Sequence, residues 1–167
     1  MKKLEYLKLS NTFAKLGADF LQEKSPDPVS NPYLIDSNPT AIKLIGLELS
    51  EIKKNEFIEY FSGNRLLPNS KPLAMAYSGH QFGSYNPRLG DGRGLLLGEV
   101  QDQNNNTLDI HLKGCGPTRF ARGFDGRATL RASIREYLGG EAIHGLGIPT
   151  TRSLAVIGTG ELVHREI

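Results

Sequence analysis

A run of alternate glycines is the first feature of this 167-residue chain that could do chemistry. The run is Leu89-Gly90-Asp91-Gly92-Arg93-Gly94, and apolar residues follow it directly. Glycine lets backbone amides approach phosphate oxygens closely, and the guanidinium of Arg93 adds a planar fork of donors. We therefore predict a phosphate-binding loop that uses Gly90, Gly92 and Arg93. Because Asp-Gly is also a common hairpin turn, a plain β-hairpin is the alternative.

A lysine follows the loop at the end of an apolar segment. In residues 107–114 the apolar side chains alternate, so Lys113 shares one face with Asp109 and His111. An ammonium group near phosphates supplies a point charge without demanding a fixed geometry. Lys113 is therefore a candidate phosphate ligand, and a solvated surface lysine is the alternative.

A glutamate in the following helix could hold that lysine. The residues three and four positions from Glu136 are all small, and they include the adjacent Gly139 and Gly140. Each glycine costs a helix about 1 kcal/mol relative to alanine. We therefore expect this face to lie close against the sheet, where a carboxylate needs a cation, and Lys113 is the candidate. The alternative is a surface glutamate paired with a neighbouring arginine.

Arginines gather around the start of the same helix. Between residues 119 and 135 the chain carries Arg119, Arg122, Arg127, Arg131 and Arg135. Cations beside a helix N-terminus favour an anion. An RNA-binding surface is the rival interpretation, but only Phe120 and Phe124 offer stacking there and the net charge is +2. We predict an anionic small ligand and no nucleic-acid partner.

Composition limits the other classes of function. Hydrophobic residues make up 38% and charged residues 23%, which is typical of a globular protein. The four histidines lack metal-ligand spacing, and the single Cys115 cannot build a structural zinc site or a disulfide. No secretory signal or stretch of about 20 apolar residues is present. These features predict a cytoplasmic protein with no membrane partner and no metal ligands in this segment.

The elements predicted to position these residues fall into two parts. Residues 1–72 read as an extension with a short helix in 4–24, a proline-rich connector in 25–40 and short helices in 41–50 and 51–63. Residues 73–167 read as a hairpin of 95–102 and 107–114, a helix at about 127–145, and strands at 151–158 and 161–167. The predicted fold class is α+β. The order of elements matches a protein-kinase-like small lobe, an antiparallel sheet plus one packed helix.

Long segments of the chain resemble the N-terminal part of the SelO (YdiU) family. They are YSGHQFG, NPRLGDGR, HLKGCGPT, DGRATLR and SIREYL through LGIPTTR, and the resemblance is dense from about residue 62 onward. It implies a pseudokinase-like fold that binds ATP in a flipped orientation. It also implies transfer of AMP from ATP to Ser, Thr or Tyr hydroxyls of proteins, with UMP transfer attributed to some members.

The resemblance also assigns residues. It implies that Gly90, Gly92 and Arg93 bind the nucleotide, that Lys113 contacts its phosphates and is held by Glu136, and that Asp125 and Gly126 line the site. It places the general base and the ligands of Mg²⁺ or Mn²⁺ after the equivalent of Ile167. We therefore expect no catalytic residue in this segment and no activity from it alone. The alternative is a non-catalytic nucleotide- or partner-binding pseudokinase lobe.

Overall fold

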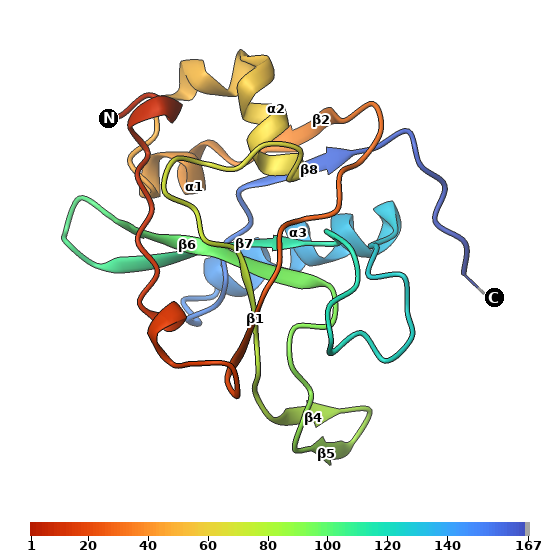
Figure 1. Ribbon diagram of the computed structural model, residues 1–167. Coiled ribbons are helices and arrows are strands. Elements are labelled where there is room, and N and C mark those ends of the chain that lie inside the picture. The colour runs from red at the N-terminus through yellow and green to blue at the C-terminus, as the bar shows by residue number, and fades with distance from the viewer. Residues whose placement is uncertain (166–167) are drawn as a thin grey trace.

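A four-stranded antiparallel sheet forms the centre of the protein (Figure 1). The structure is a computed structural model, and it describes residues 1–165. The strand order is β1-β3-β6-β7, and the strands are β1 (Leu21–Glu23), β3 (Leu73–Met75), β6 (Gly94–Gln101) and β7 (Thr107–Lys113). Seven of the eight residues of β6 are buried. Since successive side chains of a strand point to opposite faces, β6 serves two clusters. Leu95 and Leu97 pack in the larger core, and Leu96 packs with Leu21 and Leu73 on the other face.

The N-terminal part is built into the same core. Leu4, Leu7 and Phe57 pack with Leu95, and β1 pairs with β3. The division into an extension 1–72 and a lobe 73–167 stays a prediction, because the packing is continuous across it.

The local structure of the first 63 residues follows from capping and turn chemistry. Helix α1 (Pro39–Leu44) begins after Asn38, whose side chain accepts hydrogen bonds from the amides of Thr40 and Ala41. A 3₁₀ turn (Leu49–Lys53) and helix α2 (Asn55–Ser62) follow, and α2 ends at the left-handed Gly63 as predicted.

Residues 4–24 do not form the expected single helix. They form two 3₁₀ turns, Leu4–Tyr6 and Phe13–Lys15, followed by strand β1. The backbone between the turns is drawn into a tertiary pairing, because Ser10 and Glu99 exchange backbone hydrogen bonds of 3.0 and 2.6 Å.

Two smaller sheets complete the fold. The proline-rich connector contains β2 (Tyr33–Ser37), which pairs antiparallel with β8 (Ala155–Gly158). Strands β4 (Gly79–Gln81) and β5 (Ser84–Asn86) form a hairpin that projects from the body of the protein (Figure 1). Within residues 1–165 there is no helix both long enough and apolar enough to cross a membrane.

The predicted β6–β7 hairpin, the helix and the α+β class are confirmed, whereas a kinase-like architecture stays a prediction. Helix α3 (Leu130–Gly145) begins at Thr129, whose hydroxyl accepts a hydrogen bond from the Ala132 amide. The strand predicted at 161–167 is wrong over residues 161–165, which carry no strand, while 166–167 lie outside the described residues. Side chains hold this segment instead, since Glu161 accepts from the Ser30 amide and Arg165 binds Asp125.

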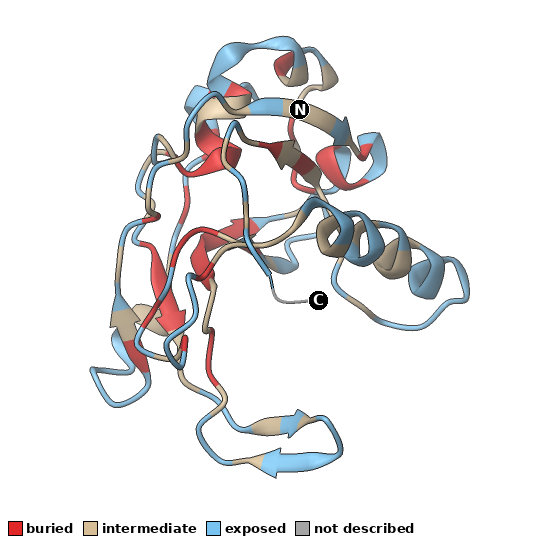
Figure 2. Ribbon diagram, turned by 90° about the vertical axis from the view of Figure 1, so that its right-hand side faces the viewer, coloured by how far each residue is buried: buried red, intermediate tan, exposed pale blue. Residues whose placement is uncertain are grey.

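Helix α3 does not pack across the β6–β7 hairpin as expected. Its main contact is with β8, and none of its residues is buried. Figure 2 shows it with half-buried and exposed residues along its whole length. Leu130, Ile134 and Leu138, whose spacing places them on one helical face, are all exposed. Polar contacts hold the helix instead, chiefly Glu141 with Arg152, which precedes β8.

Candidate functional site

The glycine-rich run ends the connection between β3 and β6, and a buried carboxylate holds it there. Asp91 Oδ2 accepts a 3.0 Å hydrogen bond from the Met75 amide and lies 3.2 Å from His111 Nε2. The Asp91 amide donates back to the Met75 carbonyl at 3.0 Å. Asp91 therefore ties the loop to β3 and, through His111, to β7.

The amides of the loop are used within the protein. Gly90 N–H donates to the Tyr77 carbonyl at 3.0 Å, and Gly92 N–H donates to the Gly90 carbonyl at 3.1 Å. The hydroxyl of Thr118 donates to the Asp91 carbonyl at 2.5 Å. A phosphate could reach the Gly90 and Gly92 amides only after this part of the loop had rearranged.

The glycines themselves allow close packing. Gly90 has φ +57°, and a Cβ at this position would overlap the Phe120 ring. A Cβ on Gly92 would lie 2.9 Å from the Phe120 carbonyl oxygen, and one on Gly94 would lie 2.5 Å from His111 Cε1. These positions are glycine because segment 118–121 and the imidazole lie directly against the loop.

The predicted ion pair is confirmed. Lys113 Nζ lies 2.7 Å from Glu136 Oε1. The pair adjoins the glycine run, since Lys113 lies opposite Gly94 in the β6–β7 ladder and the Gly114 amide donates to the Arg93 carbonyl at 2.7 Å.

The reasoning that led to the pair was wrong in one respect. The Lys113 and Glu136 side chains are 45% and 53% exposed, so the carboxylate is not pressed against the sheet. Gly139 has open space around it, and Gly140 faces the Thr151 carbonyl rather than β7. The small residues of α3 therefore do not bury the pair, and the lysine head remains reachable by a ligand.

Asp125 and Gly126 lie in the loop between β7 and α3. Gly126 has φ +68°, and a Cβ there would overlap the backbone of Gly116 and Pro117. Asp125 Oδ2 and Oδ1 accept from the Arg165 guanidinium at 2.7 and 2.9 Å, and Oδ1 also accepts from the Arg127 amide at 2.9 Å. Hydrogen bonds from Arg165 hold the pKa of Asp125 below its usual range.

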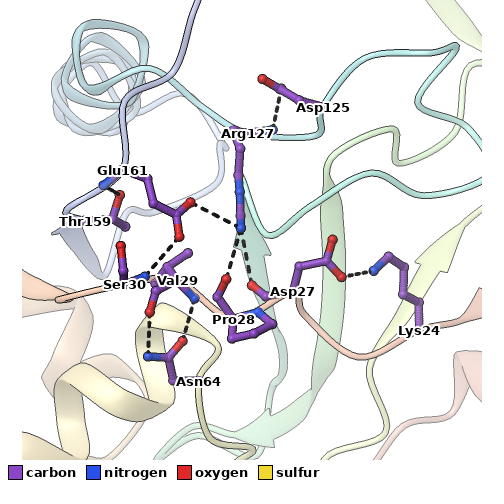
Figure 3. A network of polar contacts seen from close by, with 10 residues as sticks. All are labelled: Lys24, Asp27, Pro28, Val29, Ser30, Asn64, Asp125, Arg127, Thr159 and Glu161. Atoms are coloured by element: carbon purple, nitrogen blue, oxygen red, sulfur yellow. Dashed lines mark hydrogen bonds and ion pairs between the residues drawn. The ribbon is translucent and has the colours of Figure 1, made fainter.

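The predicted arginine cluster does not converge on one point. Arg127 lies at the centre of the network in Figure 3, where it donates to the carbonyls of Asp27 and Pro28 and pairs with Glu161 at 3.4 Å. Asn64 clamps the same segment by bonding both the amide and the carbonyl of Val29. Arg127 thus connects residues 27–30 to the loop between β7 and α3. Its position in the sequence did not indicate this structural role.

The other arginines face different directions. Arg119 donates to the carbonyls of Ala18 and Asp19 and lies over the Phe120 ring, and Arg122 donates to Gln81. Arg131 and Arg135 are exposed on α3. Of the cations, Arg93 and Lys113 adjoin the glycine run most closely, and the half-buried Arg93 donates to the Arg127 carbonyl at 3.3 Å.

Sequence reasoning missed two contacts that position these groups. The first is Asp91 with His111; the shared strand face of His111 and Lys113 was the available signal. The second is Glu141 with Arg152, joined by two hydrogen bonds of 2.7 and 2.6 Å. This second contact fixes α3, and with it Glu136, against the residues that lead into β8.

The Glu141–Arg152 contact predicts an acid-sensitive contribution to stability. Hydrogen bonds from Arg152 lower the pKa of Glu141 from 4.5 to about 2. Because the folded-state pKa is depressed, the contribution is present above about pH 4.5 and is lost as the pH falls toward 2. Glu141→Gln should therefore reduce the unfolding free energy near neutral pH by on the order of 2 kcal/mol, and by much less below about pH 3. Urea titrations of the wild-type protein and Glu141→Gln, near neutral pH and below about pH 3, measure the two free energies of unfolding. Equal losses of free energy at both pH values would contradict the prediction.

Two further groups bear on the chemistry available. Burial raises the pKa of the Cys115 thiol to about 11, so it is protonated near neutral pH and is a poor nucleophile. Across residues 1–165, no group of three or more His, Cys, Asp or Glu side chains could hold a metal ion.

The glycine-rich loop, Arg93 and the Lys113–Glu136 pair thus adjoin one another, and cations in such a position are compatible with a phosphate-containing ligand. The comparisons with known proteins show the family. The family model described as "Protein adenylyltransferase SelO" matches residues 3–167. The chain is 53% identical to the protein nucleotidyltransferase YdiU of Myxococcus xanthus, 52% to that of Photobacterium profundum and 51% to that of Pseudomonas entomophila. This chain belongs to the SelO family.

The alignments cover 99% of this chain in each case. They cover 34% of the Myxococcus and Pseudomonas proteins and 32% of the Photobacterium protein. The chain thus spans about a third of the length of these relatives.

Proposed function

We propose that this chain is the ATP-binding part of a protein nucleotidyltransferase that transfers AMP from ATP to Ser, Thr or Tyr hydroxyls of proteins. The Lys113–Glu136 pair, 2.7 Å apart and adjoining the Arg93–Gly94 backbone, is the observation that carries the proposal. Membership of a family whose relatives are named protein nucleotidyltransferases supports it.

The geometry supports roles for these residues. Glu136 fixes the direction of a lysine that stays about half exposed, so the ammonium can meet a phosphate without losing its partner. Arg93 lies one residue before the β6 position that faces Lys113, and its guanidinium donates to the Arg127 carbonyl. We propose that both cations neutralise charge on a leaving pyrophosphate. Gly90 and Gly92 lie in the loop that precedes β6, and the Asp125-Gly126 turn lies in the loop between β7 and α3.

We further propose that the 167 residues alone do not transfer nucleotide. The family pattern places the general base and the metal ligands after the equivalent of Ile167. Residues 1–165 contain no group of three or more His, Cys, Asp or Glu side chains that could hold a metal ion. Binding of ATP in the ground state alone would not accelerate the reaction.

Incubation with labelled ATP, Mg²⁺ or Mn²⁺ and a protein acceptor tests the proposal. A full-length family member should label the acceptor, whereas the purified 167-residue chain should label neither the acceptor nor itself. Labelling by the short chain that disappears on Lys113→Ala would show that it is catalytically complete.

One observation favours a non-catalytic nucleotide- or partner-binding lobe as the alternative. The amides of Gly90 and Gly92 and the carboxylate of Asp125 are all engaged within the protein. If a full-length member binds ATP but labels no acceptor under any condition, this alternative replaces the proposal.

A further inference from the structure

The connection between β3 and β6 is far longer than its strands require. The two strands are antiparallel neighbours, with Leu73 opposite Leu96, and a turn of two residues can join such a pair. Residues 76–93 make the connection instead, and their outer part is the β4–β5 hairpin. Both ribbon views show this hairpin standing away from the body of the protein (Figures 1 and 2). Long connections that keep their own structure are usually functional.

The tip of the hairpin carries a residue that folding does not explain. Gln81 lies opposite Ser84, so Phe82 and Gly83 form a two-residue turn with φ values of 52° and 78°. A turn with two left-handed residues favours Asn-Gly, because asparagine tolerates positive φ far better than phenylalanine does. The Phe82 side chain is also 97% exposed. Neither backbone preference nor burial within this chain accounts for an aromatic ring at this position.

Other aromatic rings lie near Phe82. Tyr85 is 60% exposed and its ring lies 5.4 Å from that of His80, centroid to centroid. Tyr77 is also exposed, at the base of the hairpin. The loop between β7 and α3 touches the hairpin, where Arg122 donates to Gln81 at 3.0 Å. Exposed tyrosine, phenylalanine and arginine side chains are typical of the centre of protein–protein interfaces.

The charged side chains of the hairpin and its flanking residues are positive. Residues 76–90 contain Arg88 and no aspartate or glutamate. Arg122 adjoins it through Gln81, and the ion pairs among residues 1–165 include neither Arg88 nor Arg122. A partner segment that combines carboxylates with an apolar side chain is complementary to this surface. Single-stranded RNA also uses aromatic and basic groups, but a single ring at a turn tip offers no stacking platform for successive bases.

We propose that the β4–β5 hairpin is a docking surface for the protein acceptor, which it holds through an acidic segment carrying an apolar residue. The identity of the partner as an acceptor rests on the proposed function. The hairpin leads directly into the nucleotide loop, because Gly90 donates to Tyr77 and Arg93 follows three residues later. A segment held at Phe82 and Tyr85 would thus be bound to the same connection that continues into the proposed nucleotide loop.

The variant Phe82→Asn separates docking from folding. Asparagine suits the left-handed turn, so the hairpin should form at least as well as before. In a full-length family member with the same motif, this variant should raise the KM for an acidic acceptor peptide about tenfold. Its KM for ATP and its kcat at saturating peptide should not change. Tyr6→Asn is the matched control and should change none of these values. Tyr6 is an exposed aromatic of the 3₁₀ turn Leu4–Tyr6, and the N-terminal segment containing this turn lies at the opposite end of the protein from the β4–β5 hairpin (Figure 1).

Peptide binding without ATP provides a readout that does not depend on transfer. The probe is a fluorescent serine peptide with flanking Asp, Glu and Leu residues, compared with a counterpart carrying Lys in place of the acidic residues. The wild-type protein should bind the acidic peptide at least about tenfold more tightly than Phe82→Asn does. If this difference appears although no acceptor is ever labelled, the docking surface stands and the proposed function fails.

Three results would overturn the docking surface. The first is equal binding of the acidic peptide by the wild-type protein and Phe82→Asn. The second is equal binding of the acidic and lysine peptides by the wild-type protein. The third is binding of labelled oligouridylate that is tighter than binding of the acidic peptide, depends on Phe82 and weakens steeply with salt. That result would make the hairpin an RNA-binding surface.

Discussion

Lys113→Ala in a full-length family member is expected to reduce nucleotide transfer by at least about 100-fold, the scale seen when one preorganised electrostatic partner of a transition state is removed. The unfolding free energy should fall by no more than about 1 kcal/mol, because exposed ion pairs contribute little to stability. Both side chains of the pair are about half exposed, so little packing is lost with the lysine. Transfer of labelled AMP and urea denaturation of the same preparation measure the two effects.

A charge reversal provides the control for this prediction. The double variant Lys113→Glu with Glu136→Lys can restore an ion pair between β7 and α3. If the pair merely joins two elements, the double variant should recover transfer. We expect no recovery, because the cation would then project from α3 instead of from the strand beside Arg93 and Gly94. Full activity of Lys113→Ala would remove Lys113 from the site.

The contacts that depend on local pattern were predictable from the sequence. The alternation of apolar residues in 107–113 predicted strand β7 and the face on which Lys113 lies. The apolar residues that follow Gly94 predicted β6, the strand that pairs with β7. Gly63 ends α2 with φ 89° as its residue type predicts. The Lys113–Glu136 pair was predicted from the small residues around Glu136, although the burial expected for it is absent.

The contacts that depend on tertiary packing were not predictable. The alternate glycines of residues 90–94 fit against the Phe120 ring and backbone and the His111 ring, which the sequence places 17 to 30 positions later. Arg127 belongs to a basic run, but carbonyls of residues 27 and 28 receive its hydrogen bonds. The apolar residues of α3 share one helical face, yet that face is exposed and the helix is held by Glu141 and Arg152. In each case the partner is distant in sequence, so no local pattern contains it.

The turn at Gly126 should tolerate a side chain far less well than the turn at Gly123. Both glycines have positive φ, 68° and 83°, so alanine strains the backbone at either position by about 1–2 kcal/mol. Around Gly123 there is open space, whereas a Cβ on Gly126 would overlap the Gly116-Pro117 backbone. Backbone atoms cannot move aside as a side chain can. Gly126→Ala should therefore cost about 3 kcal/mol or more, and Gly123→Ala about 1–2 kcal/mol.

The same substitution should affect the nucleotide site, because Gly126 sets the path of the loop that carries Asp125. The Gly116 amide donates to the Gly126 carbonyl at 3.2 Å, so displacing this turn also moves the segment that follows Lys113. Urea denaturation of the wild-type chain and the two variants measures the stability difference, and ATP binding by the corresponding full-length variants measures the effect on the site. We expect Gly126→Ala to weaken ATP binding and Gly123→Ala to leave it near the wild-type value. Equal stability losses in the two variants would show that the contact between Gly126 and Gly116 does not constrain the loop.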